Sequence, residues 1–212
     1  MILDESKPFS QACFNNRQPI LAVLERVFAD ASHVLEIGSG TGQHAVYFAS
    51  HLPHVRWQTA DLPENLPGIR LWLEDWYLNA GEEFGIEQPR AHLPEPLVLD
   101  VLGEWPELAF DAAFSANTAH IMPWPAVPIM FREVSARLAK DGHFAIYGPF
   151  NYDGQYTSES NARFDSWLKA NNPESGIRDF EKMNGAARQA GLELIEDNAM
   201  PANNRLLVWR KS

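Results

Sequence analysis

The chain has few of the features that mark secreted and membrane-spanning proteins. It contains one cysteine, Cys13, among 212 residues, so no internal disulfide can form. No apolar run reaches the roughly 18 residues that a membrane helix needs, and the N-terminus lacks the basic and then apolar regions of a signal peptide. We therefore expect a cytoplasmic protein that makes no use of a membrane.

Basic residues and metal-ligand patterns are also scarce. The 17 Lys and Arg residues face 28 Asp and Glu residues, which gives a formal net charge of -11 with no basic run. Such a surface repels phosphate backbones, so we expect no nucleic-acid partner, although a local basic patch can still form in three dimensions. His44, His51 and His54 have no Cys or Glu at a credible ligand spacing, so no metal site is expected.

Apolar residues, in contrast, are abundant enough for a sizeable core. They make up 45% of the chain and include 7 Trp and 12 Phe. The length predicts a single domain over residues 1–212. Within it, residues 1–30 are expected to form an irregular start and a helix on the substrate side, and residues 148–178 a lid-like insertion.

A glycine-rich turn over residues 33–45 is the most informative part of the sequence. A short apolar strand ends at Glu36-Ile37, Gly38, Gly40 and Gly42 follow with Ser39 between them, and a helical pattern begins at once. A strand, a glycine turn and a helix bring backbone N–H groups close to a ligand at a helix N-terminus. The spacing of the three glycines, G-x-G-x-G, is neither the nicotinamide-dinucleotide pattern G-x-G-x-x-G nor a P-loop, which needs a following Gly-Lys-Ser/Thr. The alternative is a tight connection without a ligand, which three alternate glycines in this context disfavour.

Strands and helices alternate along most of the chain. The expected strands cover 34–37, 55–60, 97–101, 111–115, 143–147, 192–196 and 206–209; the expected helices cover 18–29, about 41–50, a segment opened by Pro63, one opened by Pro125 and closed by 140–142, and about 180–190. Alternation favours a parallel sheet with helices on both faces. The last two strands have only a short loop between them, so they must pair antiparallel. The fold class is therefore α/β, a Rossmann-like, mostly parallel seven-stranded sheet with a reversed C-terminal hairpin.

Polar residues follow the ends of successive strands, where ligands of open α/β sheets bind. Asp61, with Leu62, follows the second strand and can accept both hydroxyls of a ribose; its alternative role is a helix cap. Asp100 follows the third strand and can accept an adenine amino group while Val101 packs on the ring; its alternative role is a solvated turn. Asn117 follows the fourth strand, and could instead satisfy loop backbone groups.

Other candidate residues could contact a second ligand, beside the ligand expected at the strand ends. His120 lies beyond the fourth strand, where it could accept a proton or merely hold its loop, and Tyr147 ends the fifth strand. These two are the candidate catalytic residues. The candidate substrate-binding residues are Asn16, Arg17, Tyr152, Asn203 and Asn204. Arg17 would suit an anionic group on that ligand, but a surface salt bridge is an equal alternative; the two asparagines could be ordinary turn residues.

The pattern E-x-G-x-G-x-G resembles the first motif of class I S-adenosylmethionine-dependent methyltransferases. Several further segments resemble the uncharacterised methyltransferase-like family DUF938, also called UPF0585; they are residues 15–21, 37–49, 51–54 with 57–58, 147–150, 160–161 with 164–165, 178–179 and 200–204. The resemblance covers nearly the whole chain and departs from the family pattern just before Asp61. It implies binding of S-adenosylmethionine but no established substrate.

These observations favour an enzyme that transfers a methyl group from S-adenosylmethionine to a small-molecule acceptor. A non-catalytic protein that binds S-adenosylmethionine or its demethylated product remains open, because no nucleophile or compulsory base marks the activity. A nicotinamide-dependent oxidoreductase is disfavoured by the glycine spacing. The sequence leaves the methylated atom and the oligomeric state open.

Overall fold

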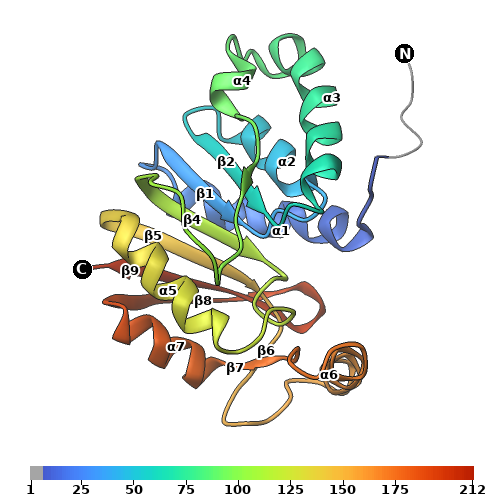
Figure 1. The fold of residues 1–212 in the computed structure, drawn as a ribbon, viewed down its shortest axis with the longest axis vertical. Coiled ribbons are helices and arrows are strands. Elements are labelled where there is room, and N and C mark those ends of the chain that lie inside the picture. Colours follow the sequence, from blue (N-terminus) through green and yellow to red (C-terminus); the bar gives the residue numbers. More distant parts are fainter. Residues whose placement is uncertain (1–6) are drawn as a thin grey trace. The chain divides into compact units, whose positions relative to one another are not determined.

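The computed structural model of the chain describes residues 7–212, so the first part of the expected irregular start lies outside the described residues. The described residues form two compact units, 7–100 and 101–212, which are coloured blue to green and green to red in Figure 1. The single domain over residues 1–212 stays a prediction.

The first unit is built on three parallel strands. In chain order its elements are α1 Gln11–Val27, β1 His33–Ile37, α2 Gln43–His51, β2 Arg56–Asp61, α3 Leu66–Phe84, α4 Pro89–His92 and β3 Leu97–Val98. The strand order is β3-β2-β1, and α2 packs between α1 and α3. Phe28, Phe48 and Trp57 are fully buried, and the Trp57 ring contacts both phenylalanine rings, so they form the centre of this core.

The second unit continues with strands of both directions. Its elements are β4 Phe110–Ala116, α5 Ala126–Arg137, β5 Leu138–Gly148, β6 Phe150–Asn151, α6 Glu159–Asn171, β7 Arg178–Asp179, α7 Phe180–Gln189, β8 Leu192–Met200, the 3-10 turn η1 Pro201–Asn203 and β9 Asn204–Lys211. β4 and β5 are parallel, whereas β5–β9 and β9–β8 are antiparallel. Helices α5 and α7 lie side by side (Figure 1). Phe131 packs edge-on against Phe144 and Trp209 in the core below them.

The three strands of the first unit and β4, β5, β9 and β8 of the second are the seven strands of a mostly parallel sheet with helices around it. The C-terminal hairpin runs in reverse, as its short loop requires. The predicted Rossmann-like α/β fold class is therefore confirmed.

The first helix was predicted wrongly at both ends. α1 begins at Gln11, inside the stretch expected to be irregular, and ends at Val27 rather than 29. Ser10 is its N-cap, because the Ser10 side chain accepts from the Cys13 N–H. The first half of the helix is polar and Pro19 lies within it, and both features hide a helix from a periodicity argument.

Two strands also differ in length from their prediction. β3 is only Leu97–Val98, so Asp100 and Val101 lie in a turn beyond it. β5 runs from Leu138 through the residues that were expected to close a helix. Gly142 makes this extension possible, because a Cβ there would lie 2.6 Å from the Asp111 carbonyl oxygen.

Residues 148–178, expected as a lid-like loop, contain regular structure. The segment holds β6 and the whole of α6, and its end enters β7, which pairs with β6 in a separate two-stranded sheet. α6 is anchored by a buried carboxylate rather than by an apolar face. Asp165 accepts from the Tyr156 hydroxyl at 2.6 Å, from Lys169 at 2.6 Å and from the Ile177 N–H at 2.7 Å.

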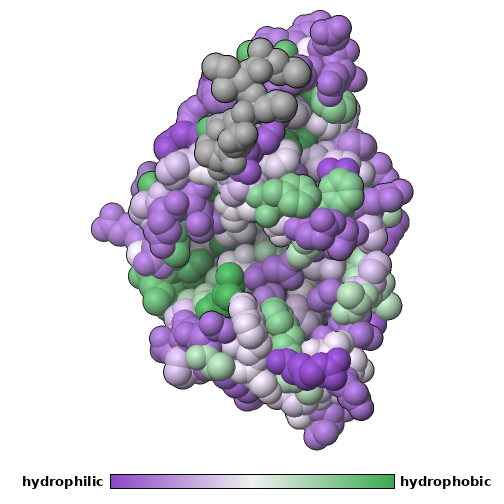
Figure 2. All heavy atoms as spheres, turned by 90° about the vertical axis from the view of Figure 1, so that its right-hand side faces the viewer, coloured by the Kyte–Doolittle hydropathy of each residue, from purple (hydrophilic) through white to green (hydrophobic). Residues whose placement is uncertain are grey.

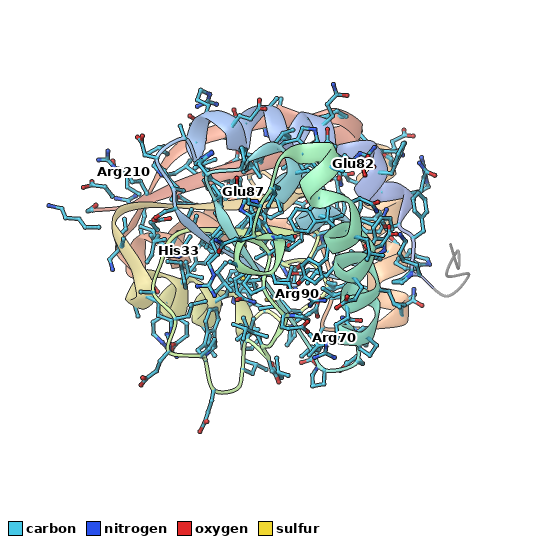
Figure 3. The ribbon with its side chains drawn as sticks, turned by 90° about the horizontal axis from the view of Figure 1, so that it is seen from above. His33, Arg70, Glu82, Glu87, Arg90 and Arg210 are labelled. Carbon is cyan, nitrogen blue, oxygen red and sulfur yellow. The ribbon has the colours of Figure 1, made fainter. Side chains whose placement is uncertain are left out.

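The face of the molecule drawn in Figure 2 is largely polar. On the face drawn in Figure 2, hydrophilic residues predominate and apolar residues form small patches. Ion pairs are frequent on the first unit, where Arg70 and Arg90, both labelled in Figure 3, share Glu95 as a partner. Within residues 7–212 no helix combines the length and the apolar character that a membrane span requires.

Candidate cofactor and acceptor sites

The glycine turn of the first unit has the conformation that its sequence predicts. Gly38, Gly40 and Gly42 all have positive φ, at 73°, 58° and 86°. A Cβ added to Gly42 would lie 3.2 Å from the Ile69 Cα, so this glycine permits close packing of α3. A Cβ added to Gly40 would meet nothing within 4 Å. Gly40 therefore borders open space, as a residue that lets a ligand approach the backbone should.

Asp61 ties the end of β2 to this turn. It is 6% exposed, and its Oδ2 accepts from the Gly40 N–H at 2.6 Å. Its Oδ1 accepts from the Leu62 N–H at 2.7 Å and from the Asn65 side chain at 2.8 Å. Asp61 is not the helix cap considered above, since α3 starts at Leu66, five residues later, and its N-cap is Asn65. The carboxylate therefore fixes the position of the glycine turn relative to the loop that follows β2.

Glu36 lies buried at the base of the glycine turn. It is 1% exposed and its Oε2 accepts from the Trp57 indole N–H at 3.0 Å. Burial raises the pKa of the Glu36 carboxyl to about 7. The neighbouring Ser39 hydroxyl accepts from the Ala60 N–H at 3.2 Å, which joins the turn to β2.

The predicted substrate-side residues of α1 already have partners within the first unit. The Asn16 side-chain oxygen accepts from His44 Nε2 at 2.6 Å, and Asn16 is 6% exposed. Burial lowers the pKa of His44 to about 4, so the ring is neutral near pH 7. The Arg17 guanidinium lies over the Phe14 and Tyr47 rings, at 4.3 and 4.5 Å from their centroids. A ligand role for Asn16 and Arg17 stays a prediction.

Residues 7–10 form a strap over α2 and α3 that the sequence did not reveal. The Ser10 N–H donates to Gln43 at 2.5 Å, and the Trp72 indole donates to the Pro8 carbonyl at 2.6 Å. Lys7 pairs with Asp75 and lies over the Trp72 ring. Gln43 is the first residue of α2, so the strap reaches the helix that follows the glycine turn.

The remaining predicted cofactor residues occupy loops. Leu62 is 38% exposed beside Asp61. Asp100 is exposed at the end of the first unit, and Val101 is buried at the start of the second. Asn117 directly follows β4 with φ of 58°, an uncommon conformation outside glycine, and its N–H donates to the Tyr147 carbonyl at 2.8 Å.

The two predicted catalytic residues are both buried in the second unit. His120 is 6% exposed, packs edge-on against Phe164, and lies close to Gly148. Burial first, and the charge of Arg178 second, lower its pKa to about 4. The imidazole is therefore neutral near pH 7 and is a weaker base than an exposed histidine. Tyr147 is 3% exposed on β5.

Three of the predicted substrate-binding residues line one cavity of the second unit. The cavity has a volume of about 460 Å³ and is lined by Tyr152, Thr157, Ala199, Met200, Asn203, Asn204 and Arg205. Its wall includes the hairpin turn, where Ala202 and Asn203 both have positive φ. The buried Asn161 fixes that turn by donating to the Asn203 carbonyl at 3.2 Å. The structure thus brings Tyr152, Asn203 and Asn204 together.

Arg205 is the cavity residue that the sequence reasoning missed. Its Nε donates to Asp197 Oδ1 at 2.7 Å and its Nη2 donates to the Asp197 carbonyl at 3.0 Å. Tyr152 completes the cluster, since its hydroxyl donates to Asp197 Oδ2 at 2.9 Å. Burial, together with this bond, raises the pKa of Tyr152. The antiparallel register places Arg205 opposite Ala199 near the turn, a signal that was available once the hairpin was predicted.

Comparison with known proteins gives a family and a fold. The sequence profile of the family described as "Protein of unknown function (DUF938)" matches residues 7–211. An O-methyltransferase family protein from Burkholderia thailandensis is 18% identical, with a TM-score of 0.73 over 92% of this chain and 56% of that one. Human N-acetylserotonin methyltransferase, in complex with S-adenosylmethionine, is 14% identical, with a TM-score of 0.73 over 95% and 53%.

A third solved structure is also similar in fold. The O-methyltransferase family 2 protein from Planctomyces limnophilus DSM 3776, in complex with apigenin, is 17% identical, with a TM-score of 0.68 over 92% of this chain and 62% of that one. The chain therefore spans between 53% and 62% of the length of these three proteins. At such identities the likeness shows a methyltransferase fold and nothing finer.

Proposed function

The chain belongs to the DUF938 family, and from this premise we propose that it is an S-adenosylmethionine-dependent methyltransferase that acts on a small molecule. The open space at Gly40 carries the proposal. A glycine with φ of 58°, beside which a Cβ would meet nothing, leaves room for a ligand against the backbone. The buried Asp61 carboxylate beside it supplies an acceptor for ribose hydroxyls.

The residues that would hold the cofactor are Glu36, Gly38, Ser39, Gly40, Gly42, Asp61, Leu62, Asp100, Val101 and Asn117. The glycine turn would receive the part of the cofactor nearest the backbone, and Asp61 the ribose. When bound, S-adenosylmethionine supplies an electrophilic methyl group. Similar folds that bind it support this assignment, among them the human enzyme named above and PigF, which was solved with the demethylated product.

A metabolite-sized acceptor is favoured by the 460 Å³ cavity of the second unit. Pockets for small molecules commonly have volumes of roughly 300–1,000 Å³. The apigenin bound by the Planctomyces protein is a ligand of this size class. Asn16, Arg17, Tyr152, Asn203 and Asn204 remain our proposed substrate-binding residues, and the acidic surface disfavours nucleic acid.

In the proposed reaction the protein mainly positions the acceptor and excludes water, since methyl transfer needs no compulsory base. His120 and Tyr147 are the proposed catalytic residues. The low pKa of His120 keeps its ring neutral near pH 7, so it can accept a hydrogen bond or a proton from the acceptor.

A calorimetric titration with S-adenosylmethionine, S-adenosylhomocysteine and NADH tests the cofactor. We expect the first two to bind and NADH not to bind. Gly40→Val should abolish this binding, because the branched side chain would fill the open space, and should destabilise the fold by about 1–2 kcal/mol through its positive φ. Binding of NADH alone, or undiminished binding by a folded Gly40→Val variant, would refute the assignment. A protein that binds both ligands but transfers no methyl group would be the non-catalytic binding protein.

A further inference from the structure

The hairpin cavity of the second unit contains a guanidinium that is only partly engaged. Arg205 lines the cavity, and its side chain is 28% exposed. No Asp or Glu is among the other lining residues, and Asp197 is the partner of Arg205. We propose that Arg205 binds a carboxylate on the methyl acceptor, so that the substrate class is a small organic acid; this inference rests on the function proposed above.

The geometry of the Arg205–Asp197 pair supports this assignment. A guanidinium has five N–H donors. Those of Nε and Nη2 form its side edge, and those of Nη1 and Nη2 form its end. The bonds to Asp197 use Nε and Nη2, which is the side edge. The end of the guanidinium is not used in that pairing. Two parallel N–H groups at this end match the two oxygens of a carboxylate.

Asp197 orients Arg205 without filling the cavity. Its Oδ1 accepts from Arg205, while its Oδ2 accepts from Tyr152, so both oxygens are used. Tyr152 in turn stacks on Phe180, with ring centroids 5.1 Å apart. The guanidinium is thus held before any ligand arrives, which lowers the entropy lost on binding.

The hairpin turn adds hydrogen-bond acceptors to the same cavity. The Asn204 side-chain nitrogen donates to the Pro201 carbonyl at 3.1 Å, which fixes the amide with its oxygen as the remaining polar atom. Asn203 likewise donates from its nitrogen, to Ser160 at 3.4 Å. Amide oxygens accept hydrogen bonds from hydroxyl or amine groups. The cavity therefore suits an acid that also carries a hydroxyl or amine, the kind of group that accepts a methyl.

Arg205 is also better placed than Arg17 to bind the carboxylate of the acceptor. The sequence made Arg17 the expected cation for an anionic acceptor. In the structure its guanidinium lies between two aromatic rings of the first unit, whereas Arg205 lines the cavity that holds Tyr152, Asn203 and Asn204. The contact with the anionic group of the acceptor is therefore assigned to Arg205, and Arg17, still a proposed substrate-binding residue, is not needed for that contact.

Ligand-observed NMR on the full chain, saturated with S-adenosylhomocysteine, tests the proposal. The probes are carboxylates from acetate to benzoate and para-hydroxybenzoate, each paired with its neutral amide. We expect at least one acid to bind tenfold or more tightly than its amide. Arg205→Lys should remove that preference, because lysine can keep the charge and the contact with Asp197 but lacks the second parallel N–H.

Arg210→Lys is the matched control. Arg210 lies on the same strand, at the periphery of the ribbon in Figure 3, and contacts only Asp141 at 4.0 Å among the ion pairs of the described residues. It should leave the preference unchanged. The proposal is overturned if no acid binds better than its amide, if Arg205→Lys keeps the preference, or if Arg210→Lys removes it too.

A second measurement separates this proposal from the proposed function. Release of S-adenosylhomocysteine is followed with the same acids and amides as acceptors, in the parent and in Arg205→Lys. Turnover of amides as fast as acids would refute the carboxylate site and leave methyl transfer intact. Selective binding of acids without any turnover would support the site and count against catalysis.

Discussion

Replacing Asp61 with Ala should damage both the fold and the proposed cofactor site of the first unit. The carboxylate is 6% exposed and accepts three hydrogen bonds, of 2.6, 2.7 and 2.8 Å, from Gly40, Leu62 and Asn65. Hydrogen bonds to charged groups contribute about 1.5–3 kcal/mol each, but the freed N–H groups lie at a loop that water can reach. We expect a net loss of about 2–4 kcal/mol in the free energy of unfolding.

The affinity for S-adenosylhomocysteine should fall at least tenfold, because the variant loses the proposed ribose acceptor and the anchor of the glycine turn. Asp61→Asn should be intermediate in both properties, since one amide oxygen still accepts while the amide nitrogen cannot accept from its neighbour. Urea unfolding measures the stability, and calorimetry measures the affinity of variants that remain folded.

Glu64→Ala is the control for the loss of a negative charge near the same loop. Because Glu64 is exposed, the free energy of unfolding of Glu64→Ala should differ from that of the parent by less than about 0.5 kcal/mol. The affinity of this variant for S-adenosylhomocysteine should not change. If Asp61→Ala is as stable as the parent, the carboxylate does not anchor the turn. If its affinity is unchanged, Asp61 is not part of the cofactor site.

Three further variants test separate parts of the account. Glu36→Gln should gain stability relative to the parent as the pH rises from 4.5 to 8, by up to about 3 kcal/mol in the free energy of unfolding measured with urea. The reason is that the buried Glu36 carboxyl of the folded parent, with a pKa of about 7, loses its proton over this range, whereas glutamine has no proton to lose. A difference that is constant with pH would contradict the buried, protonated Glu36. His120→Ala should slow methyl transfer by about 10²–10⁴-fold with the cofactor affinity little altered, and undiminished turnover would show that His120 only holds its loop. Gly68→Ala should lower the free energy of unfolding by about 1–2 kcal/mol in thermal or urea unfolding, because its Cβ would lie 2.7 Å from Pro8. The control Gly185→Ala, whose Cβ would meet nothing within 4 Å, should not lower it. Equal effects of the two variants would contradict the packing of the strap on α3.

The sequence was most informative where local chemistry decides the structure. A positive φ at alternate positions between a strand and a helix can be inferred from glycines alone, and the structure has it at Gly38, Gly40 and Gly42. The reversed hairpin followed from the short loop between the last two strands, and its turn residues Asn203 and Asn204 do line a cavity.

The failures occurred where polar interactions replace an apolar pattern. α6 was missed because its buried residues are Asn161, Asp165 and Leu168, two of which are polar. Periodicity of apolar residues cannot find such a helix. Arg205 was missed for a related reason. Its position depends on a hydrogen bond to Asp197, which also accepts from Tyr152, and an apolar pattern does not reveal such contacts.

The most direct test of the central claim is transfer of a labelled methyl group. The purified chain is incubated with methyl-labelled S-adenosylmethionine and a metabolite extract, and the products are separated by mass. The account predicts label in a small molecule, with S-adenosylhomocysteine formed in equal amount, and no transfer by Gly40→Val. Binding of S-adenosylmethionine by the parent without any labelled product would contradict the claim that this protein is a methyltransferase.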